Sequence, residues 1–540
     1  MTAEPDIVEE PVHDLVEAPE DVGLVHRDPV LALQHMEAAL VRADLEAPDV
    51  LSPEEFRRLR YLLSFARLTT FEPGAALGKR GRGDVQVDLT QLRERVVGAL
   101  HGPLRELRGG RARLEAGRAI AGSLQTLLEE TREALPGNEF SRAELDAEVG
   151  YKSLVCVLGG GGGSGYVYLG GMQAMLAAGL VPALIVANSF GSIVGSVTSR
   201  ALPVPIADYI EWSKTVRYGS VLGPESRRRR HGMPGVFALR FDAFADPVFR
   251  FADGTPMRLQ DTAIPFEVVV AGVRRQSFDR LPSRFRRTEL ASLGLRALPG
   301  KKPGAAAFIA ARMWQVGAFI DSRVVKPIVL GGDPLTEQLN VVDAVSFSAS
   351  VPGVLHHESR DPQMWPLLDQ LLADKDVAAL VDGGAASNVP AELAYKRVRD
   401  GRLGTRNVCV VAWDCLHPQW NPRHLWLQPI TQAVALQMVR NAPYADRVVK
   451  FSPTLAATSL APPPALIDRA MGWGAASAER TVPFVARMLE PVWWDTELAP
   501  RKHPKAHAKR LPDVQELLEA APQPPRATIR SRIWRAKRSG

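Results

Sequence analysis

The 540-residue sequence predicts an α/β fold: a three-layer α/β/α domain with a mostly parallel central sheet, preceded by a helical N-terminal region. Three observations support this prediction. Beyond residue 150, short runs rich in Val, Ile and Leu alternate with segments of helical periodicity, as in parallel sheets covered on both faces. Residues 153–199 contain no charged side chain, which is typical of the buried centre of such a domain. Residues 28–70 and 88–135 instead show helix-start signals and helical spacing of apolar residues.

The helical region contains two clear start signals. The segment "DPVLALQHMEAALVRADL" opens at residue 28 with an Asp cap and a proline, and "SPEEFRRLRYLLSFARL" opens at residue 52 with Ser-Pro-Glu-Glu. A basic, Gly-rich connector, "GKRGRGD", separates them from the next helical stretch. We therefore expect four parts: an acidic tail at 1–27, a helical region at 28–150, the α/β domain at 151–495, and a basic tail at 496–540.

The two tails carry opposite charges, although the formal net charge of the chain is only +6. Residues 1–22 hold eight acidic and no Lys or Arg side chains, and the last fifteen hold six basic and no acidic ones. Both segments are therefore expected to stay solvated. The three cysteines are Cys156, Cys409 and Cys415. They show neither metal-ligand spacing nor the even count of a disulfide framework, which indicates a reducing compartment. We expect no metal and no cofactor.

The stretch "VLGGGGGSGYVYLGGM" at 157–172 places five consecutive glycines behind an apolar run. It satisfies the G-x-G-x-x-G spacing of dinucleotide sites, but no acidic residue for the ribose follows before Arg200. It contains no lysine, which argues against a Walker phosphate loop. A third use of such a loop is to point backbone N–H groups at the oxyanion of an acyl-transfer intermediate, assisted by the helix expected to begin near Gly165.

A nucleophile for such a site is found one strand later, in "LIVANSFGSIVGS" at 184–196. Ser189 lies between an apolar strand and a helix, as in the strained turn called a nucleophile elbow. Gly191 provides the small residue that this turn requires, whereas Ala187 adds a methyl group where the pattern usually has glycine. Taken alone, the serine also fits a simple helix N-cap.

Together with "AALVDGGAASNVPAE" at 378–392, the glycine loop and the serine turn resemble the patatin-like phospholipases. That family has a G-G-G-x-R/K-G loop, a G-x-S-x-G elbow and a distant D-G-G/A. The segment "AVSFSASVPGVL" at 344–355 resembles the block that precedes the D-G-G strand, and "PFEVVVAGV" at 265–273 occupies the place of a central strand. The resemblance covers about residues 150–480 and implies a patatin-like fold for the α/β domain.

The resemblance implies a serine acyl hydrolase, a lipase or phospholipase that cleaves glycerolipid acyl esters. Ser189 would be the nucleophile and Asp382 its general base, in a Ser–Asp dyad without histidine. Six glycines would support them: Gly160, Gly161 and Gly162 as oxyanion donors, Gly191 in the elbow, and Gly383 and Gly384 in the turn after Asp382. The resemblance leaves open whether phospholipid or acylglycerol is cleaved, at which position, and whether the acyl acceptor is always water.

Two departures from the family pattern keep other interpretations open. Ser164 stands where the family loop has Arg or Lys, and Ala187 replaces the first elbow glycine. A catalytically weak or inactive lipid-binding protein with this fold is one alternative. A Ser-His-Asp esterase is another, with His417 following the strand "NVCVVAWDC" and with further candidates in His356 and His357.

A lipid substrate implies contact with an interface. We expect peripheral membrane contact through 363–376 and the basic C-terminal tail, although the apolar residues of 363–376 fit core packing equally well: Trp365, Leu367, Leu368, Leu371 and Leu372. Nucleic-acid binding by the tail, or by "SRRRRHG" at 226–232, is the less favoured use of these charges. Without a signal peptide or an apolar span, a cytoplasmic or peripheral membrane location is expected, and secretion as an effector is also compatible.

Overall fold

The computed structural model describes residues 28–135, 137–224, 230–235, 237–241, 245, 247–280, 321–418, 428–498 and 511. The acidic tail, most of the basic tail and most of the arginine run at 226–232 lie outside these residues. Within them, the chain forms a helical N-terminal region and an α/β domain with a mostly parallel sheet. The predicted fold class is confirmed.

Within the described residues, the N-terminal region contains five α-helices and a short hairpin. They are α2 (Pro29–Glu46), α3 (Pro53–Ala66), α4 (Thr90–His101), α5 (Gly110–Ala134) and α6 (Arg142–Gly150), with β1 (Thr70–Phe71) paired to β2 (Val85–Gln86). The predicted start signals act as caps. The Asp28 carboxylate accepts a hydrogen bond from the Leu31 N–H (3.0 Å), and Ser52 forms a capping box with Glu55.

The central sheet has seven strands, which are β3 (Ser153–Leu158), β4 (Leu184–Asn188), β7 (Phe266–Arg274), β8 (Val325–Leu330), β10 (Val377–Asp382), β11 (Val408–Asp414) and β12 (Arg447–Lys450). β12, β11, β3, β4 and β7 are parallel neighbours in that order. β8 and β10 both pair with β7 in the antiparallel direction. A second sheet is formed by β5 (Leu222–Pro224), β6 (Phe237–Leu239) and β9 (Leu355–His356).

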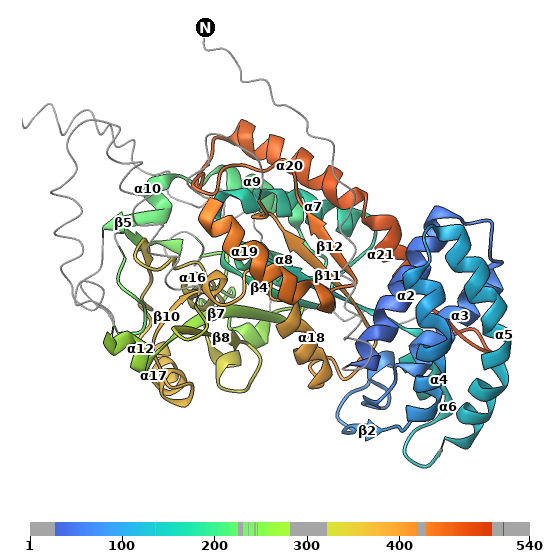
Figure 1. The fold of residues 1–540 in the computed structure, drawn as a ribbon. Helices are drawn as coiled ribbons and strands as arrows, with labels where there is room; N and C mark the ends of the chain where they lie inside the picture. Colours follow the sequence, from blue (N-terminus) through green and yellow to red (C-terminus); the bar gives the residue numbers. More distant parts are fainter. Residues whose placement is uncertain are drawn as a thin grey trace, which may run out of the picture.

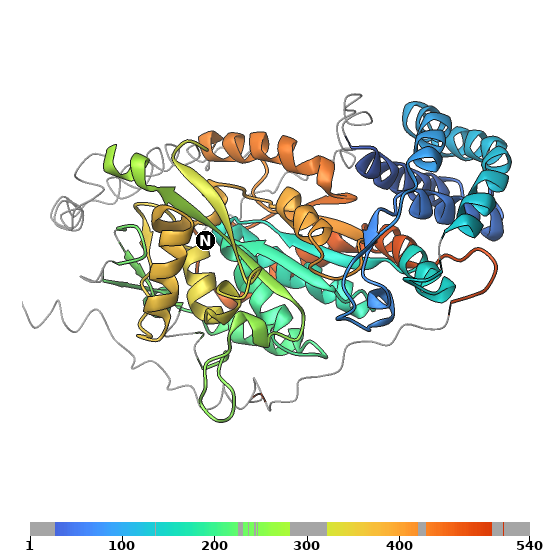
Figure 2. The ribbon, with the colours of Figure 1, turned by 90° about the horizontal axis from the view of Figure 1, so that it is seen from below.

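Helices cover both faces of the sheet, which explains the near-continuous apolar strands. One face carries α7 (Val167–Ala177), α8 (Ser189–Ser199), α16 (Val341–Ser348) and α20 (Pro464–Glu479). The other face carries α18 (Ala391–Arg399) and α19 (Gln428–Asn441). In both Figure 1 and Figure 2 the N-terminal helices (blue) stand at one end of this layered domain.

The uncharged stretch 153–199 is divided among five elements: β3, the 3-10 helix Gly162–Tyr166, α7, β4 and α8. Each of its two α-helices has only 11 residues, so the stretch is the interior of the sheet domain rather than a membrane span. Within the described part of the chain, no helix combines the length and the apolar character needed to cross a bilayer.

The other α-helices of the described residues are α9 (Ile206–Lys214), α10 (Tyr218–Val221), α12 (Arg275–Arg280), α17 (Met364–Asp374) and α21 (Val482–Leu489). In α17, Leu368, Leu371 and Leu372 are buried in the hydrophobic core. These three leucines follow the core-packing interpretation, whereas Trp365 and Leu367 are half-buried. Membrane contact through 363–376 stays a prediction.

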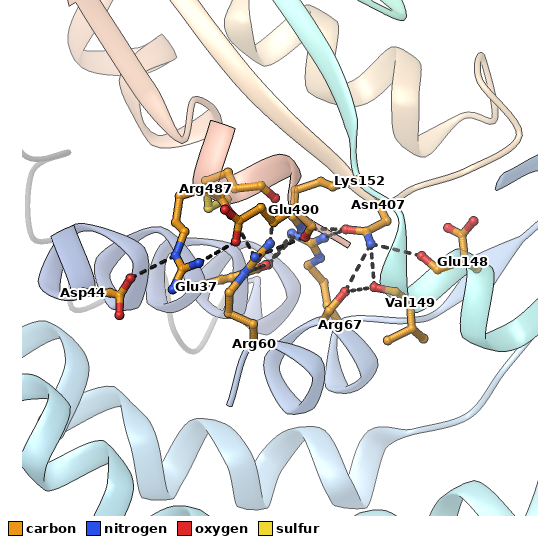
Figure 3. A network of polar contacts seen from close by, with 12 residues as sticks. Glu37, Asp44, Arg60, Arg67, Glu148, Val149, Lys152, Asn407, Arg487 and Glu490 are labelled. Atoms are coloured by element: carbon orange, nitrogen blue, oxygen red, sulfur yellow. Dashed lines mark hydrogen bonds and ion pairs between the residues drawn. The ribbon is translucent and has the colours of Figure 1, made fainter. Parts of the chain in front are cut away.

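A buried polar network joins the N-terminal region to the α/β domain (Figure 3). The Glu37 carboxylate on α2 accepts a hydrogen bond from Lys152 Nζ (2.9 Å) and pairs with Arg60 of α3 and with Arg67, the residue that follows α3. Arg60 also donates to the carbonyls of Arg487 (2.8 Å) and Met488 (2.6 Å). These carbonyls lie at the C-terminal end of α21, where the helix itself supplies no N–H donor for them. The network thus holds α2, α3 and α21 together.

Candidate active site

Two strands bring the predicted serine and aspartate together by sharing one edge of β7. Residues 268–273 of β7 pair with β8 along the opposite edge. On the shared edge, β4 ends with Asn188 opposite Val269, and β10, running the other way, ends with Asp382 opposite Val270. Because these two strands end at adjacent register positions, the residue after Asn188 meets the last residue of β10.

Ser189 begins α8 directly after β4, with an extended Asn188 before it. Its φ of +48° lies in the left-handed region, which a non-glycine residue rarely adopts. Helix and strand approach closely just beyond it, since a Cβ at Gly191 would lie 2.4 Å from the carbonyl oxygen of Leu158. The backbone around Ser189 therefore has the strained strand-to-helix geometry of a nucleophile elbow.

Asp382 is buried at the end of β10. Burial raises the pKa of its carboxyl to about 6, while hydrogen bonds from the Ser189 hydroxyl and from the Gly384 N–H act in the opposite direction. The Gly384 N–H lies 2.8 Å from Asp382 Oδ1. The carboxylate is thus aimed at the serine hydroxyl, and its pKa is close to the range in which a general base works at neutral pH.

The glycine loop passes beside Ser189, since a Cβ at Gly160 would lie 2.8 Å from Ser189 Cβ. The Gly160 N–H donates to the backbone carbonyl of Asn388 (3.1 Å), which argues against the oxyanion role expected of this amide. The N–H groups of Gly161 and Gly162 have no hydrogen-bond partner in the part of the chain that the structure describes. Gly162 also has a φ of +54°, which favours glycine there.

Comparison with known families agrees with this geometry. Residues 156–395 match the family model of the patatin-like phospholipases. The chain contains a patatin-like phospholipase domain. No curated protein matches the chain. Membership of the domain in this family indicates lipid acyl hydrolase activity, and all three glycine- and serine-containing motifs lie within the matched residues.

Ser164 stands where the patatin-like loop has Arg or Lys, and its side chain makes a hydrogen bond within the loop. The Ser164 hydroxyl donates to the Gly161 carbonyl (2.6 Å) and lies 3.3 Å from Cys415 Sγ. Burial raises the pKa of the Cys415 thiol to about 12, so this neighbour is neutral. Ser164 therefore supplies loop rigidity and no positive charge. The other departure, Ala187, is accommodated in the buried strand.

Two side-chain amides that sequence analysis did not single out tie the motifs to one another: the buried Asn388 and the half-buried Gln437. Asn388 accepts from Gly160 at its backbone carbonyl and donates to the Gly160 carbonyl from Nδ2 (3.3 Å). The Asn388 carbonyl also accepts a hydrogen bond from Asn188 Nδ2 (2.8 Å). Gln437 of α19 binds the Asn388 N–H (2.7 Å) and the Gly384 carbonyl (3.2 Å). Asn388 follows the D-G-G motif in the sequence, but nothing local links Gln437 to it.

The histidines considered as alternatives serve other contacts. His356 Nδ1 lies 2.8 Å from the Met233 carbonyl, and His357 Nε2 lies 2.9 Å from Asp343. His417 interacts with Asp414, and burial lowers the pKa of its imidazole. Within the described residues, the acid–base group that hydrogen-bonds to the Ser189 hydroxyl is Asp382, not a histidine.

We expect Gly191→Ala to disable the elbow. The added methyl group would have to displace the Leu158 carbonyl, and overpacking of this kind costs about 1–3 kcal/mol of unfolding free energy. Urea unfolding measures this loss, and we expect ester turnover to fall with it because Ser189 is two residues away. Gly98→Ala on α4, where a Cβ meets nothing within 4 Å, is the matched control. Equal stability of the two variants would contradict the close approach.

Proposed function

We propose that the protein is a serine acyl hydrolase that cleaves glycerolipid acyl esters through Ser189 and Asp382. The observation that carries this proposal is that β4 and β10 end at adjacent positions of β7, which places a strained elbow serine beside a buried carboxylate whose pKa the serine hydroxyl lowers. Its position inside a patatin-like phospholipase domain supports a lipid ester as the substrate. A histidine is not needed, since Asp382 itself faces the hydroxyl.

In the proposed reaction, Ser189 Oγ attacks the ester carbonyl carbon while its proton passes to the Asp382 carboxylate. The carbonyl oxygen becomes an oxyanion, which the N–H groups of Gly161 and Gly162 stabilise. Collapse of this intermediate expels the alcohol, which takes the proton from Asp382, and leaves an acyl-serine. Water then attacks the acyl carbon, passes its proton to Asp382, and the fatty acid leaves as the serine is reprotonated.

The pKa of Asp382 sets the expected pH dependence. Because the carboxylate must be ionised to accept a proton, kcat/KM should fall as the pH drops below about 6 and level off above it. An unshifted aspartate would instead place this acid limb near 4. The pH profile of p-nitrophenyl ester hydrolysis measures the limb, and a limb near 4 would contradict a buried aspartate as the base.

Turnover of a short-chain p-nitrophenyl ester by the full-length protein tests the proposal. Wild type should hydrolyse the ester, Ser189→Ala should not, and His417→Ala should retain the wild-type rate. Loss of activity in His417→Ala with retention in Asp382→Asn would support the Ser-His-Asp alternative. A silent wild type would support the inactive lipid-binding alternative. Release of fatty acid from phospholipid and from acylglycerol vesicles, compared side by side, identifies the substrate class.

A further inference from the structure

We propose that Ser348 is a positioning residue for the nucleophile, an inference that rests on the proposed function. Ser348 is the last residue of α16 and is completely buried. It belongs to the "AVSFSASVPGVL" segment, which the sequence singles out without a chemical role. Its hydroxyl accepts a hydrogen bond from the Ser189 N–H (2.8 Å) and donates one to the Val269 carbonyl (2.7 Å).

The Ser348 hydroxyl provides a hydrogen-bond partner for a backbone N–H that the elbow leaves without one. Ser189 leaves the β-ladder immediately after Asn188, and its N–H stands at the start of α8, where no helical carbonyl is available. A buried N–H without a partner is costly, and the Ser348 hydroxyl supplies the partner. Val269, the other group held by this hydroxyl, is the β7 residue paired with Asn188. Ser348 thus bridges the elbow and β7, the neighbour of the strand that leads into the elbow.

The same turn also holds the aspartate. The carbonyl of Ser350 accepts a hydrogen bond from the Asp382 N–H (2.9 Å). Ser350 Oγ in turn donates to the Ser346 carbonyl (2.7 Å), which ties the turn to α16. Residues 348–350 therefore bind the backbone N–H groups of both members of the proposed dyad. The Ser348 side chain accepts from the Ser189 N–H, and the Ser350 main-chain carbonyl accepts from the Asp382 N–H. Only the first of these two contacts can be removed by substitution.

Removing the Ser348 hydroxyl should change kcat more than KM. The direction of the Ser189 Oγ depends on a backbone conformation that is unfavourable for serine, and Ser348 holds the peptide group that precedes it. A misplacement of about 1 Å in a reacting group can cost about 10²-fold in rate. The Asp382 carboxylate and the glycine loop keep their own contacts, so the acid limb of the pH profile should stay where it is in wild type.

The test compares kcat and KM for a p-nitrophenyl ester in full-length wild type, Ser348→Ala and Ser346→Ala. Ser346 is an equally buried serine on the same helix, and its hydroxyl has no hydrogen-bond partner within the described residues. We expect Ser348→Ala to lower kcat by about 10- to 100-fold with KM within about 3-fold of wild type. Labelling by a fluorophosphonate should slow by a similar factor, and Ser346→Ala should match wild type in both assays.

Several outcomes would overturn the inference. Wild-type kcat in Ser348→Ala would do so, as would equal losses in both alanine variants. If Ser348→Ala does not unfold cooperatively, Ser348→Cys replaces it, since a thiol is a weaker acceptor of similar shape, and its kcat should lie below wild type. Full activity of Ser348→Cys would contradict the proposal. A silent wild type would refute the proposed function itself, whereas an active wild type with an equally active Ser348→Ala would refute this inference alone.

Discussion

Asp382→Asn is expected to lower kcat for ester hydrolysis by about 10⁴-fold, the order of loss that follows replacement of the aspartate of a Ser-His-Asp triad by asparagine. Asparagine has nearly the shape of aspartate, but it cannot take the proton from the Ser189 hydroxyl. The main-chain contact between residue 382 and the Ser350 carbonyl does not depend on the side chain and should persist. Initial rates at pH 8, where the wild-type carboxylate is ionised, measure the effect.

The same variant should be more stable than wild type at that pH. Burial raises the Asp382 pKa from 3.8 to about 6, so its contribution to stability is full below pH 3.8 and is lost as the pH rises through 6. A neutral amide escapes this cost, which is on the order of 3 kcal/mol because one pKa unit corresponds to about 1.4 kcal/mol. Loss of turnover with gain of stability in urea would exclude misfolding as the cause. Substantial activity in Asp382→Asn would contradict the dyad.

Glu37→Gln is expected to destabilise the protein by about 3–5 kcal/mol, because it leaves buried cations without their counter-ion. Burial acts to raise the pKa of the Glu37 carboxyl, but Lys152, Arg67 and Arg60 together hold it at about 2. Burial and the nearby Arg67 lower the pKa of Lys152 to about 8, so the lysine is still protonated at pH 7. Glutamine keeps the shape of the side chain and removes only the charge, and urea unfolding at pH 7 measures the loss.

Glu54→Gln provides the matched control for this prediction. Glu54 lies in the same N-terminal region and pairs with Arg58 at 2.7 Å, but both side chains are exposed. Exposed pairs of this kind contribute less than about 0.5 kcal/mol. If Glu37→Gln unfolded at the same urea concentration as Glu54→Gln, the network in Figure 3 would not be what joins the helical region to the sheet domain.

Several features of the fold and of the site could be predicted from the sequence because each is determined by neighbouring residues in the chain. The helix caps at Asp28 and Ser52 and the apolar strands follow from side-chain chemistry and periodicity. Gly191 was also predictable, since an elbow needs a small residue at that distance from the serine. In contrast, the meeting of Ser189 with Asp382 depends on two strands ending at adjacent positions of β7, and no local pattern specifies that register.

Contacts between distant segments account for what the sequence did not predict. The engagement of the Gly160 amide depends on Asn388, more than 200 residues away. Gln437, like Cys415, lies beyond the family match and reaches the site only through the packing of its own element. The segment 363–376 was ambiguous because a half-apolar helix has the same sequence pattern whether it faces a core or a lipid surface.

The measurement that tests the central claim most directly is fluorophosphonate labelling of the full-length protein, followed by peptide mass spectrometry. We expect a single adduct on Ser189 in wild type, an unchanged adduct in His417→Ala, and labelling slowed by orders of magnitude in Asp382→Asn. An adduct on another serine, or equal labelling rates in wild type and Asp382→Asn, would contradict a nucleophile activated by Asp382.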